Sequence, residues 1–225
     1  MKYRSIAIDG PSGAGKSTIA KKLASDIGFI YVDTGAIYRS VALYDIENGI
    51  DLDNKDNVIE NLPNIIIDIS YDGDGLQRMF LCGRDVTDAI RIPEVSAGAS
   101  KVSAIGQVRE FLLEKQRDFA KRNNVIMDGR DIGTIVLPNA DLKIYLTASA
   151  ESRAERRYNE LRGRGIDVSL DEVFRDMKIR DENDSRRAVA PLKKAADAVE
   201  VDTTHMSLDE SYAAIKKIAE ETLGI

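Results

Sequence analysis

The sequence predicts an α/β protein in which helices flank a five-stranded parallel sheet. Two observations support this prediction. Five short, mostly apolar segments read as buried strands, and segments with helical periodicity follow several of them. The first strand also runs into a glycine-rich loop and then a helix, which is the context in which such loops bind phosphate. Ligands of such sheets are expected at the carboxyl ends of the strands.

The strands are predicted, in chain order, at residues 3–9, 29–33, 125–128, 142–146 and 198–201. Between the first two, apolar residues recur every four positions at Ile19, Leu23 and Ile27, which predicts a helix that ends at the following glycine. A second helix is predicted over 35–49. The last helix begins at Ser207, where a glutamate three residues later completes a capping box.

Residues 64–86 interrupt this alternation. Two β-like runs surround a turn-rich D-G-D-G segment at 72–75, and no helical pattern lies between them. The segment therefore predicts a hairpin in a small insert. The total length of 225 residues is that of a single domain.

Composition excludes several classes of function. The formal net charge of −6 makes the chain a poor candidate for binding nucleic acid polymers. Cys82 is the only cysteine, so no disulfide can form within the chain, which fits a reducing compartment. No apolar run has the length of a membrane span and no signal peptide is recognisable, so we expect a cytoplasmic location.

The loop after the first strand, DGPSGAGKST at 9–18, has the Walker A spacing G-x-x-x-x-G-K-[ST]. Its backbone N–H groups can converge on phosphate oxygens at the positive end of the next helix. Lys16 is expected to contact the β and γ phosphates of a nucleotide, and Ser17 to bind Mg²⁺. The predicted nucleotide-binding residues are Gly10, Pro11, Ser12, Gly13, Ala14, Gly15, Lys16, Ser17 and Thr18.

The segment VIMDGRD at 125–131 is a strand that ends in an acid, which suggests the Walker B partner of this loop. Asp128 would then lie near the Mg²⁺ ion. The alternative is an ordinary aspartate that caps the following turn. Arg130 and Asp131 follow at the same edge of the sheet, where ligands bind.

Residues 151–187 hold nine arginines and one lysine. Helical spacing places Arg153, Arg156 and Arg157 on one face, and Arg180, Asp184 and Arg187 on another, where Asp184 could pair with one of the two arginines. Arginine suits phosphate because its planar fork donates two hydrogen bonds. With a turn at 163–165, the segment could form a mobile flap that excludes water. The alternative is a salt-bridged surface helix.

Further along, VDTGAIYR at 32–39 offers the Thr34 hydroxyl and the Arg39 guanidinium after a strand end. Together with DGPSGAGKS, DGRDIGTIV, KIYL and RDENDSRRAVAPL, this segment resembles the bacterial cytidylate kinase family of nucleoside monophosphate kinases. The matches follow one another in order from residue 5 to residue 202.

The resemblance implies one P-loop kinase domain over 1–225, with a lid near 150–172. It also implies a CMP-binding arm near 35–110, into which the small antiparallel β insert is built. The implied reaction is ATP + CMP ⇌ ADP + CDP, with dCMP also accepted, ATP bound with Mg²⁺ and no tightly held protein-ligated metal. A monomer is the family's usual state.

The resemblance further assigns residues. Contacts with CMP are implied for Thr34, Tyr38, Arg39, Ser100, Arg109, Arg130, Asp131, Arg180, Asp184 and Arg187. Arg156 and Arg157 belong to the implied lid and would contact ATP. Lys16, Arg130, Arg180 and Arg187 are expected to act in catalysis.

The acceptor in such a reaction is an ionised phosphate oxygen, which needs no strong base. This agrees with the single histidine, His205, which lies near the C-terminus and for which an exposed or capping role is expected. Two other classes stay open. A nucleotide-dependent switch should carry the base-reading motifs of GTPases, which are absent. A kinase for shikimate or a CoA precursor should lack DTGAIYR followed by an inserted hairpin.

Overall fold

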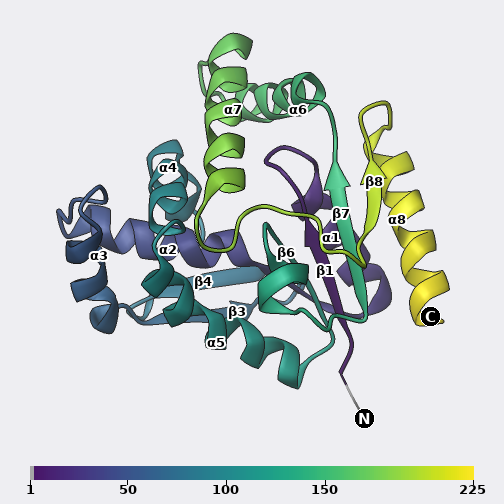
Figure 1. Ribbon diagram of the computed structural model, residues 1–225, viewed down its shortest axis with the longest axis horizontal. Helices are drawn as coiled ribbons and strands as arrows, with labels where there is room; N and C mark the ends of the chain where they lie inside the picture. The colour runs from purple at the N-terminus through teal and green to yellow at the C-terminus, as the bar shows by residue number, and fades with distance from the viewer. Residues whose placement is uncertain (1–2) are drawn as a thin grey trace.

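The computed structural model describes residues 3–225, and its centre is a five-stranded sheet in the order β2-β6-β1-β7-β8 (Figure 1). Every neighbouring pair in this sheet is parallel. The strands are β1 (Ser5–Asp9), β2 (Ile30–Asp33), β6 (Val125–Gly129), β7 (Leu142–Thr147) and β8 (Val199–Asp202). The predicted sheet is therefore confirmed. Because all five strands point the same way, the loops after β1, β2 and β6 meet at one edge.

Both faces of the sheet are covered by helices. Ile6 and Ile8 of β1 point to the face covered by α1 (Lys16–Ile27) and α8 (Leu208–Leu223), whereas Ala7 points to the opposite face. The opposite face is covered by α2 (Thr34–Glu47) and α5 (Gly106–Arg122). The predicted ends are confirmed for α1, which stops at a glycine with φ 68°, and for α8, which begins with a capping box at Ser207.

The predicted hairpin is confirmed and extended. The strands β3 (Ile67–Tyr71) and β4 (Gln77–Leu81) pair antiparallel, and a short third strand, β5 (Arg84–Asp85), adds to β4. Helix α3 (Lys55–Asn61) and the turn η1 (Leu62–Asn64) precede the insert, and the turn η2 (Ala89–Arg91) follows it. The next helix, α4 (Pro93–Val102), lies against α2.

Helices α6 (Ala150–Gly163) and α7 (Leu170–Arg186) stand above the carboxyl ends of the strands (Figure 1). They have an apolar cluster of their own, made by Ala154, Leu161, Val173 and Met177. A π-helical turn, η3 (Ile132–Val136), follows β6. Within residues 3–225 no helix combines the length and the apolar character that a membrane crossing needs.

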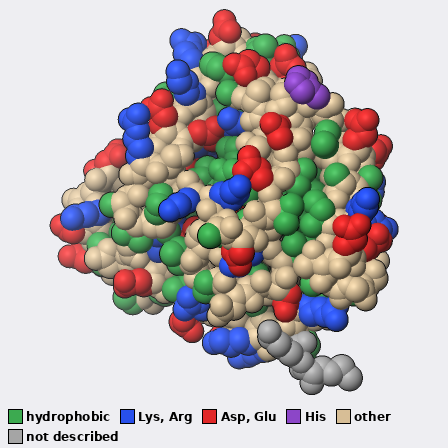
Figure 2. Space-filling model, turned by 45° about the vertical axis from the view of Figure 1, so that its right-hand side comes forward, with side chains coloured by type: hydrophobic (Ala, Val, Ile, Leu, Met, Phe, Trp, Pro, Cys, Tyr) green, Lys and Arg blue, Asp and Glu red, His purple; other side chains and the backbone are tan. Residues whose placement is uncertain are grey.

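The face of the molecule in Figure 2 mixes Lys and Arg with Asp and Glu, and no single sign of charge dominates it. His205, the single histidine, is exposed on this face, as expected.

Candidate functional site

A cleft of about 960 Å³ opens at the carboxyl ends of β1, β2 and β6. It lies between the P-loop, α2, α4, α5 and the α6–α7 pair. Of the residues predicted to bind nucleotide, substrate or metal, all but Gly10 and Pro11 line this cleft. The fold thus brings together one site from segments that span residues 12 to 211 of the chain.

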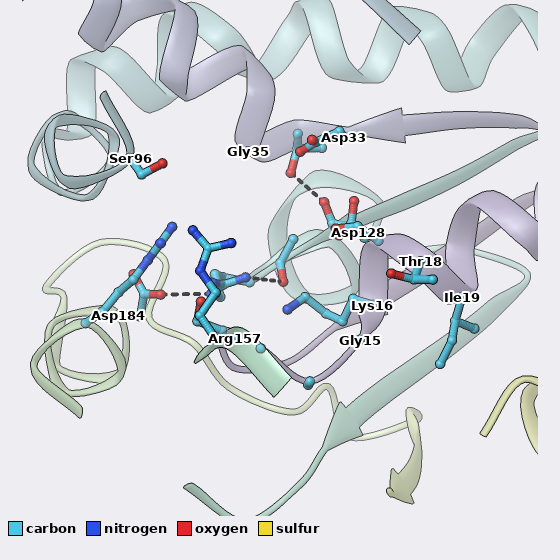
Figure 3. A pocket seen from close by; sticks show the side chains of 18 of the residues that line it. Gly15, Lys16, Thr18, Ile19, Asp33, Gly35, Ser96, Asp128, Arg157 and Asp184 are labelled. Atoms are coloured by element: carbon cyan, nitrogen blue, oxygen red, sulfur yellow. Dashed lines mark hydrogen bonds and ion pairs between the residues drawn. The ribbon is translucent and has the colours of Figure 1, made fainter. Parts of the chain in front are cut away.

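The P-loop has the strained backbone that its glycines allow. Gly10, Gly13 and Gly15 have φ angles of 148°, 74° and 90°. A Cβ atom on Gly10 would lie 1.9 Å from the carbonyl oxygen of Leu146, so no larger residue fits there. Lys16 projects into the pocket (Figure 3), and its Nζ donates to the carbonyl of Pro11 at 2.7 Å. Burial and, to a smaller extent, nearby Arg130 together lower the pKa of Lys16 to about 7.

Asp128 links the end of β6 to the start of α1. Its Oδ2 accepts from the Ser17 hydroxyl at 2.7 Å, and its Oδ1 accepts from the Tyr31 hydroxyl at 2.8 Å. Burial and the neighbouring Asp33 raise the pKa of Asp128. Its carboxylate therefore does not cap the next turn, which was the alternative interpretation. That turn, η3, is held by Asp9, whose carboxylate accepts the N–H groups of Ile132 and Gly133 at 2.8 and 2.7 Å.

The pair of Ser17 and Asp128 fits a magnesium ion chemically, because hydroxyl and carboxylate oxygens are the ligands that Mg²⁺ prefers. Within residues 3–225 no group of three or more His, Cys, Asp or Glu side chains is arranged to hold a metal. Mg²⁺ usually binds through one or two protein ligands together with substrate phosphates.

The start of α2 forms the second end of the cleft. Asp33 caps the helix by accepting the Ala36 N–H at 2.9 Å, and its other oxygen pairs with Arg39 at 2.8 Å. The Thr34 hydroxyl donates to the carbonyl of Asp128 at 2.7 Å. Asp33, the last residue of β2, was missed in the sequence analysis, although it is a strand-end acid like Asp128.

Arg109 of α5 and Asp131 form an ion pair with both side chains buried. The Arg109 guanidinium lies 5.3 Å from the ring centre of Tyr38, and its Nη1 donates to the carbonyl of Ser103 at 3.2 Å. Ser100 lies one turn earlier, and its carbonyl accepts from the Ser103 hydroxyl at 3.0 Å. These contacts place an arginine beside an aromatic ring in a cation–π arrangement, which helps to orient the Arg109 guanidinium at the cleft.

The expected pairing of Asp184 with one of the two arginines is present for Arg187, although Arg130 is a closer partner. The nearest partner of Asp184 is Arg130, with Nε to Oδ2 at 2.8 Å, whereas Arg187 lies 3.9 Å away. Helix α7 ends at Arg186, so Arg187 lies outside the helix. Burial alone would raise the pKa of Asp184, but Arg130 and Arg187 hold it below its usual value.

Five arginines meet in the cleft and form the arginine cluster: Arg39, Arg109, Arg130, Arg180 and Arg187. Their positive charges outnumber the negative charges of the aspartates that pair with them. Burial and nearby Arg130 lower the pKa of Arg180 to about 10. One buried nitrogen in each of four arginines has no hydrogen-bond partner within residues 3–225: Arg39 Nε, Arg109 Nε, Arg180 Nε and Arg187 Nη2. Unpaired buried donors are costly, so they indicate a site whose partner is an anionic ligand.

The three arginines placed on one face of α6 have different surroundings. Arg156 donates to the carbonyl of Thr203 at 2.6 Å, and Arg157 pairs with Glu160 at 2.7 Å. Both line the cleft, whereas Arg153 does not. Arg153 is buried and donates to the carbonyl of Ser12 at 3.0 Å, so it stabilises the P-loop from outside the cleft.

Comparisons with known proteins agree with this geometry. A family model described as cytidylate kinase matches residues 6–221. A cytidylate kinase from Caldicellulosiruptor bescii is 52% identical over 210 residues, which are 93% of this chain and 92% of the relative. A cytidylate kinase from Carboxydothermus hydrogenoformans is 49% identical over 213 residues, which are 95% and 96% of the two chains.

Among solved structures, an uncharacterized protein from Eubacterium ventriosum has the same fold, with a TM-score of 0.54 and 16% identity over 98% of this chain and 99% of that one. The sequence matches go further than fold, because they extend over nearly the whole chain at high identity. The chain belongs to the cytidylate kinase family.

Proposed function

We propose that the cleft holds ATP at its P-loop end and CMP or dCMP at the end formed by α2, α4 and α5. As a cytidylate kinase, the chain transfers the γ-phosphoryl group of ATP to CMP or dCMP and forms CDP or dCDP. The observation that supports the assignment of the two ends is their convergence. Lys16 of the P-loop and the arginine cluster line a single cleft, so two phosphate-binding regions face each other.

The charges of the cleft suit a polyanion. Lys16 and Arg180 both have lowered pKa values because they are buried near Arg130. An anionic phosphate chain would stabilise their charged forms and satisfy donors that lack partners. We expect Lys16 to bind the β and γ phosphates of ATP, and Arg39 and Arg109 to bind the phosphate of CMP.

The reaction needs positioning more than proton transfer. An oxygen of the CMP phosphate attacks the γ-phosphorus of ATP, and the bond between that phosphorus and the bridging oxygen breaks. The electron pair remains on the β-phosphate of ADP, so no proton is consumed at the acceptor. Arg130, Arg180 and Arg187 would stabilise charge on the phosphoryl group in transfer. Asp184 would fix the Arg130 fork, because it bonds to Arg130 Nε at 2.8 Å.

Ser17 and Asp128 would hold Mg²⁺, which when bound neutralises phosphate charge and orients the donor. Their hydrogen bond of 2.7 Å keeps both oxygens at the P-loop. Lys16 and the loop backbone would hold the same phosphates from the other side.

Two parts of the chain would close over the substrates. We assign the CMP-binding arm to 35–110 and the lid to 150–172, since each supplies cleft residues from outside the central sheet. Closure after the acceptor binds would exclude water and thereby limit the hydrolysis of ATP. We further propose that the protein acts as a monomer in the cytoplasm.

A coupled assay of ADP release tests the assignment. Purified protein would be given ATP and Mg²⁺ with CMP, dCMP, UMP or AMP in turn, and without an acceptor. We expect fast turnover with CMP and dCMP and little ATP consumption without an acceptor. Acceptor-independent ATP hydrolysis, or a preference for AMP, would contradict the proposal.

A further inference from the structure

Gln77, the first residue of β4, contacts the acceptor end of the cleft from outside it. The side chain is buried, with 8% of the residue exposed. Its Oε1 accepts the backbone N–H of Asp33 at 2.7 Å. Because that N–H can only donate, the amide oxygen must face it. The Gln77 amide nitrogen turns toward the sulfur of Met79 at 2.9 Å.

The hydrogen bond between Asp33 and Gln77 satisfies a backbone donor at the edge of the sheet. β2 is an edge strand of the described sheet and pairs with β6 on its inner side. Its outward N–H and C=O groups therefore need partners from elsewhere. The insert provides three of them through side chains: Gln77 accepts the Asp33 N–H, its Nε2 also donates to the Asp33 carbonyl at 3.5 Å, and the Tyr71 hydroxyl donates to the carbonyl of Tyr31 at 3.0 Å.

Asp33 in turn orients Arg39, the arginine that we expect to bind the acceptor phosphate. One carboxylate oxygen caps α2 at the Ala36 N–H, and the other pairs with Arg39. There is little free space around this pair, because a Cβ atom on Gly35 would lie 3.1 Å from both Arg39 Nη1 and Asp33 Oδ1. Asp33 and Gly35 lie together at the border of the pocket (Figure 3). A shift of the Asp33 backbone would therefore shift the Arg39 fork.

We propose that Gln77 is a positioning residue of the acceptor site, which holds Asp33 in place and thereby orients Arg39 toward the acceptor phosphate. The inference rests on the proposed function, because it assumes that Arg39 binds CMP. It assigns the three-stranded insert a role in acceptor binding that acts through one side chain. Gln77 itself does not line the main cleft.

Tyr71 offers a matched control, because it joins the same insert to the same strand. Its hydroxyl bonds to Tyr31, which lies two residues before Asp33 and on the opposite face of β2 from the α2 side. Tyr71→Phe removes one hydrogen bond of the insert and leaves the Asp33–Arg39 pair untouched. If the insert merely anchors the edge of the sheet, the two substitutions should act alike.

The test measures KM for CMP, KM for ATP, kcat and Tm in the wild type, Gln77→Met and Tyr71→Phe. Methionine has nearly the size of glutamine but cannot accept the Asp33 N–H well. We expect KM for CMP to rise about tenfold in Gln77→Met, as an unpaired buried donor implies. KM for ATP should stay within about twofold, and Tyr71→Phe should leave both KM values near those of the wild type.

Equal changes in both KM values, or the same KM profile in the two variants, would overturn the proposal. Should Gln77→Met fail to fold, Gln77→Asn keeps an amide but shortens the side chain by one methylene, and it should raise KM for CMP in the same selective way. If the wild type itself fails to phosphorylate CMP, the proposed function is wrong, which the same assay separates from a failure of the Gln77 inference.

Discussion

Asp45 is a buried carboxylate with no hydrogen-bond partner among the described residues 3–225, and we expect it to make stability depend on pH. It lies in α2, is fully buried, and neither carboxylate oxygen has a hydrogen-bond partner within residues 3–225. Burial raises its pKa from 3.8 to about 6. The folded protein therefore holds a proton on Asp45 at pH values where the unfolded chain has released it.

The sign and size of the effect follow from this difference. Because the folded pKa is the higher one, stability is lost as the pH rises from about 4 to about 6, and the loss is complete above that range. The cost at neutral pH is about 3 kcal/mol, since each tenfold change in proton affinity corresponds to ~1.4 kcal/mol. Asp45→Asn removes the charge, so we expect it to stabilise the protein by up to about 3 kcal/mol at pH 8.

Urea unfolding followed by circular dichroism at pH 5, 6, 7 and 8 measures this. The free energy difference between Asp45→Asn and the wild type should widen by about 1.5 kcal/mol from pH 5 to pH 8. In thermal unfolding at pH 8, Tm should rise by about 6–12 °C. Asp68→Asn, an exposed residue of β3 with the same change of charge, is the control and should show neither effect. A pH-independent difference, or a less stable Asp45→Asn at pH 8, would refute the reasoning.

Three further substitutions test the cleft. Lys16→Ala should lower turnover by at least about a hundredfold while the far-ultraviolet circular dichroism stays unchanged, and near-normal turnover would remove the donor-site assignment. Asp131→Ala should raise KM for CMP more than KM for ATP, and should also lower Tm because it leaves Arg109 buried without its partner; equal weakening of both substrates would speak against an acceptor role. Arg187→Lys should lower kcat by about a thousandfold with smaller changes in KM, because lysine lacks the planar fork; a change confined to KM for CMP would make Arg187 a ground-state contact.

The sequence was sufficient for features whose geometry is local. The P-loop glycines, the helix after them and the strand-end position of Asp128 all follow from spacing and backbone chemistry. Parallel strands share an edge, so the convergence of Lys16 and Asp128 could also be predicted. These residues needed no knowledge of how distant segments pack.

Partners that come from distant segments could not be predicted in this way. Arg130 bonds to Asp184 across 54 positions, and Arg153 reaches the P-loop carbonyl of Ser12 across 141. Helical spacing pointed to Arg180 and Arg187 as partners of Asp184. The helix ends before Arg187, which stays 3.9 Å from Asp184, and the fold brings Arg130 closer. Side-chain reach between elements depends on tertiary packing, on which a periodic pattern carries no information.

The acids at the strand ends orient the elements that surround the cleft. Asp9, Asp33 and Asp128 lie at the ends of β1, β2 and β6, next to one another in the sheet. Asp9 accepts the backbone N–H groups at the start of η3. Asp33 accepts a backbone N–H at the start of α2 and pairs with Arg39. Asp128 accepts from the hydroxyls of Ser17 and Tyr31.

Burial raises the pKa values of Asp9 and Asp128, with Asp131 and Asp33 adding to the rise at Asp9 and Asp128 respectively, but the hydrogen bonds that the two carboxylates accept oppose it. A carboxylate whose oxygens are already hydrogen-bonded in this way orients its neighbours and is poorly placed to take a proton from a substrate. We therefore expect rate to depend on the fixed positions of Lys16 and the arginines, and kcat to show no requirement for a deprotonated general base. Such a requirement is unnecessary when the acceptor is already an ionised phosphate oxygen.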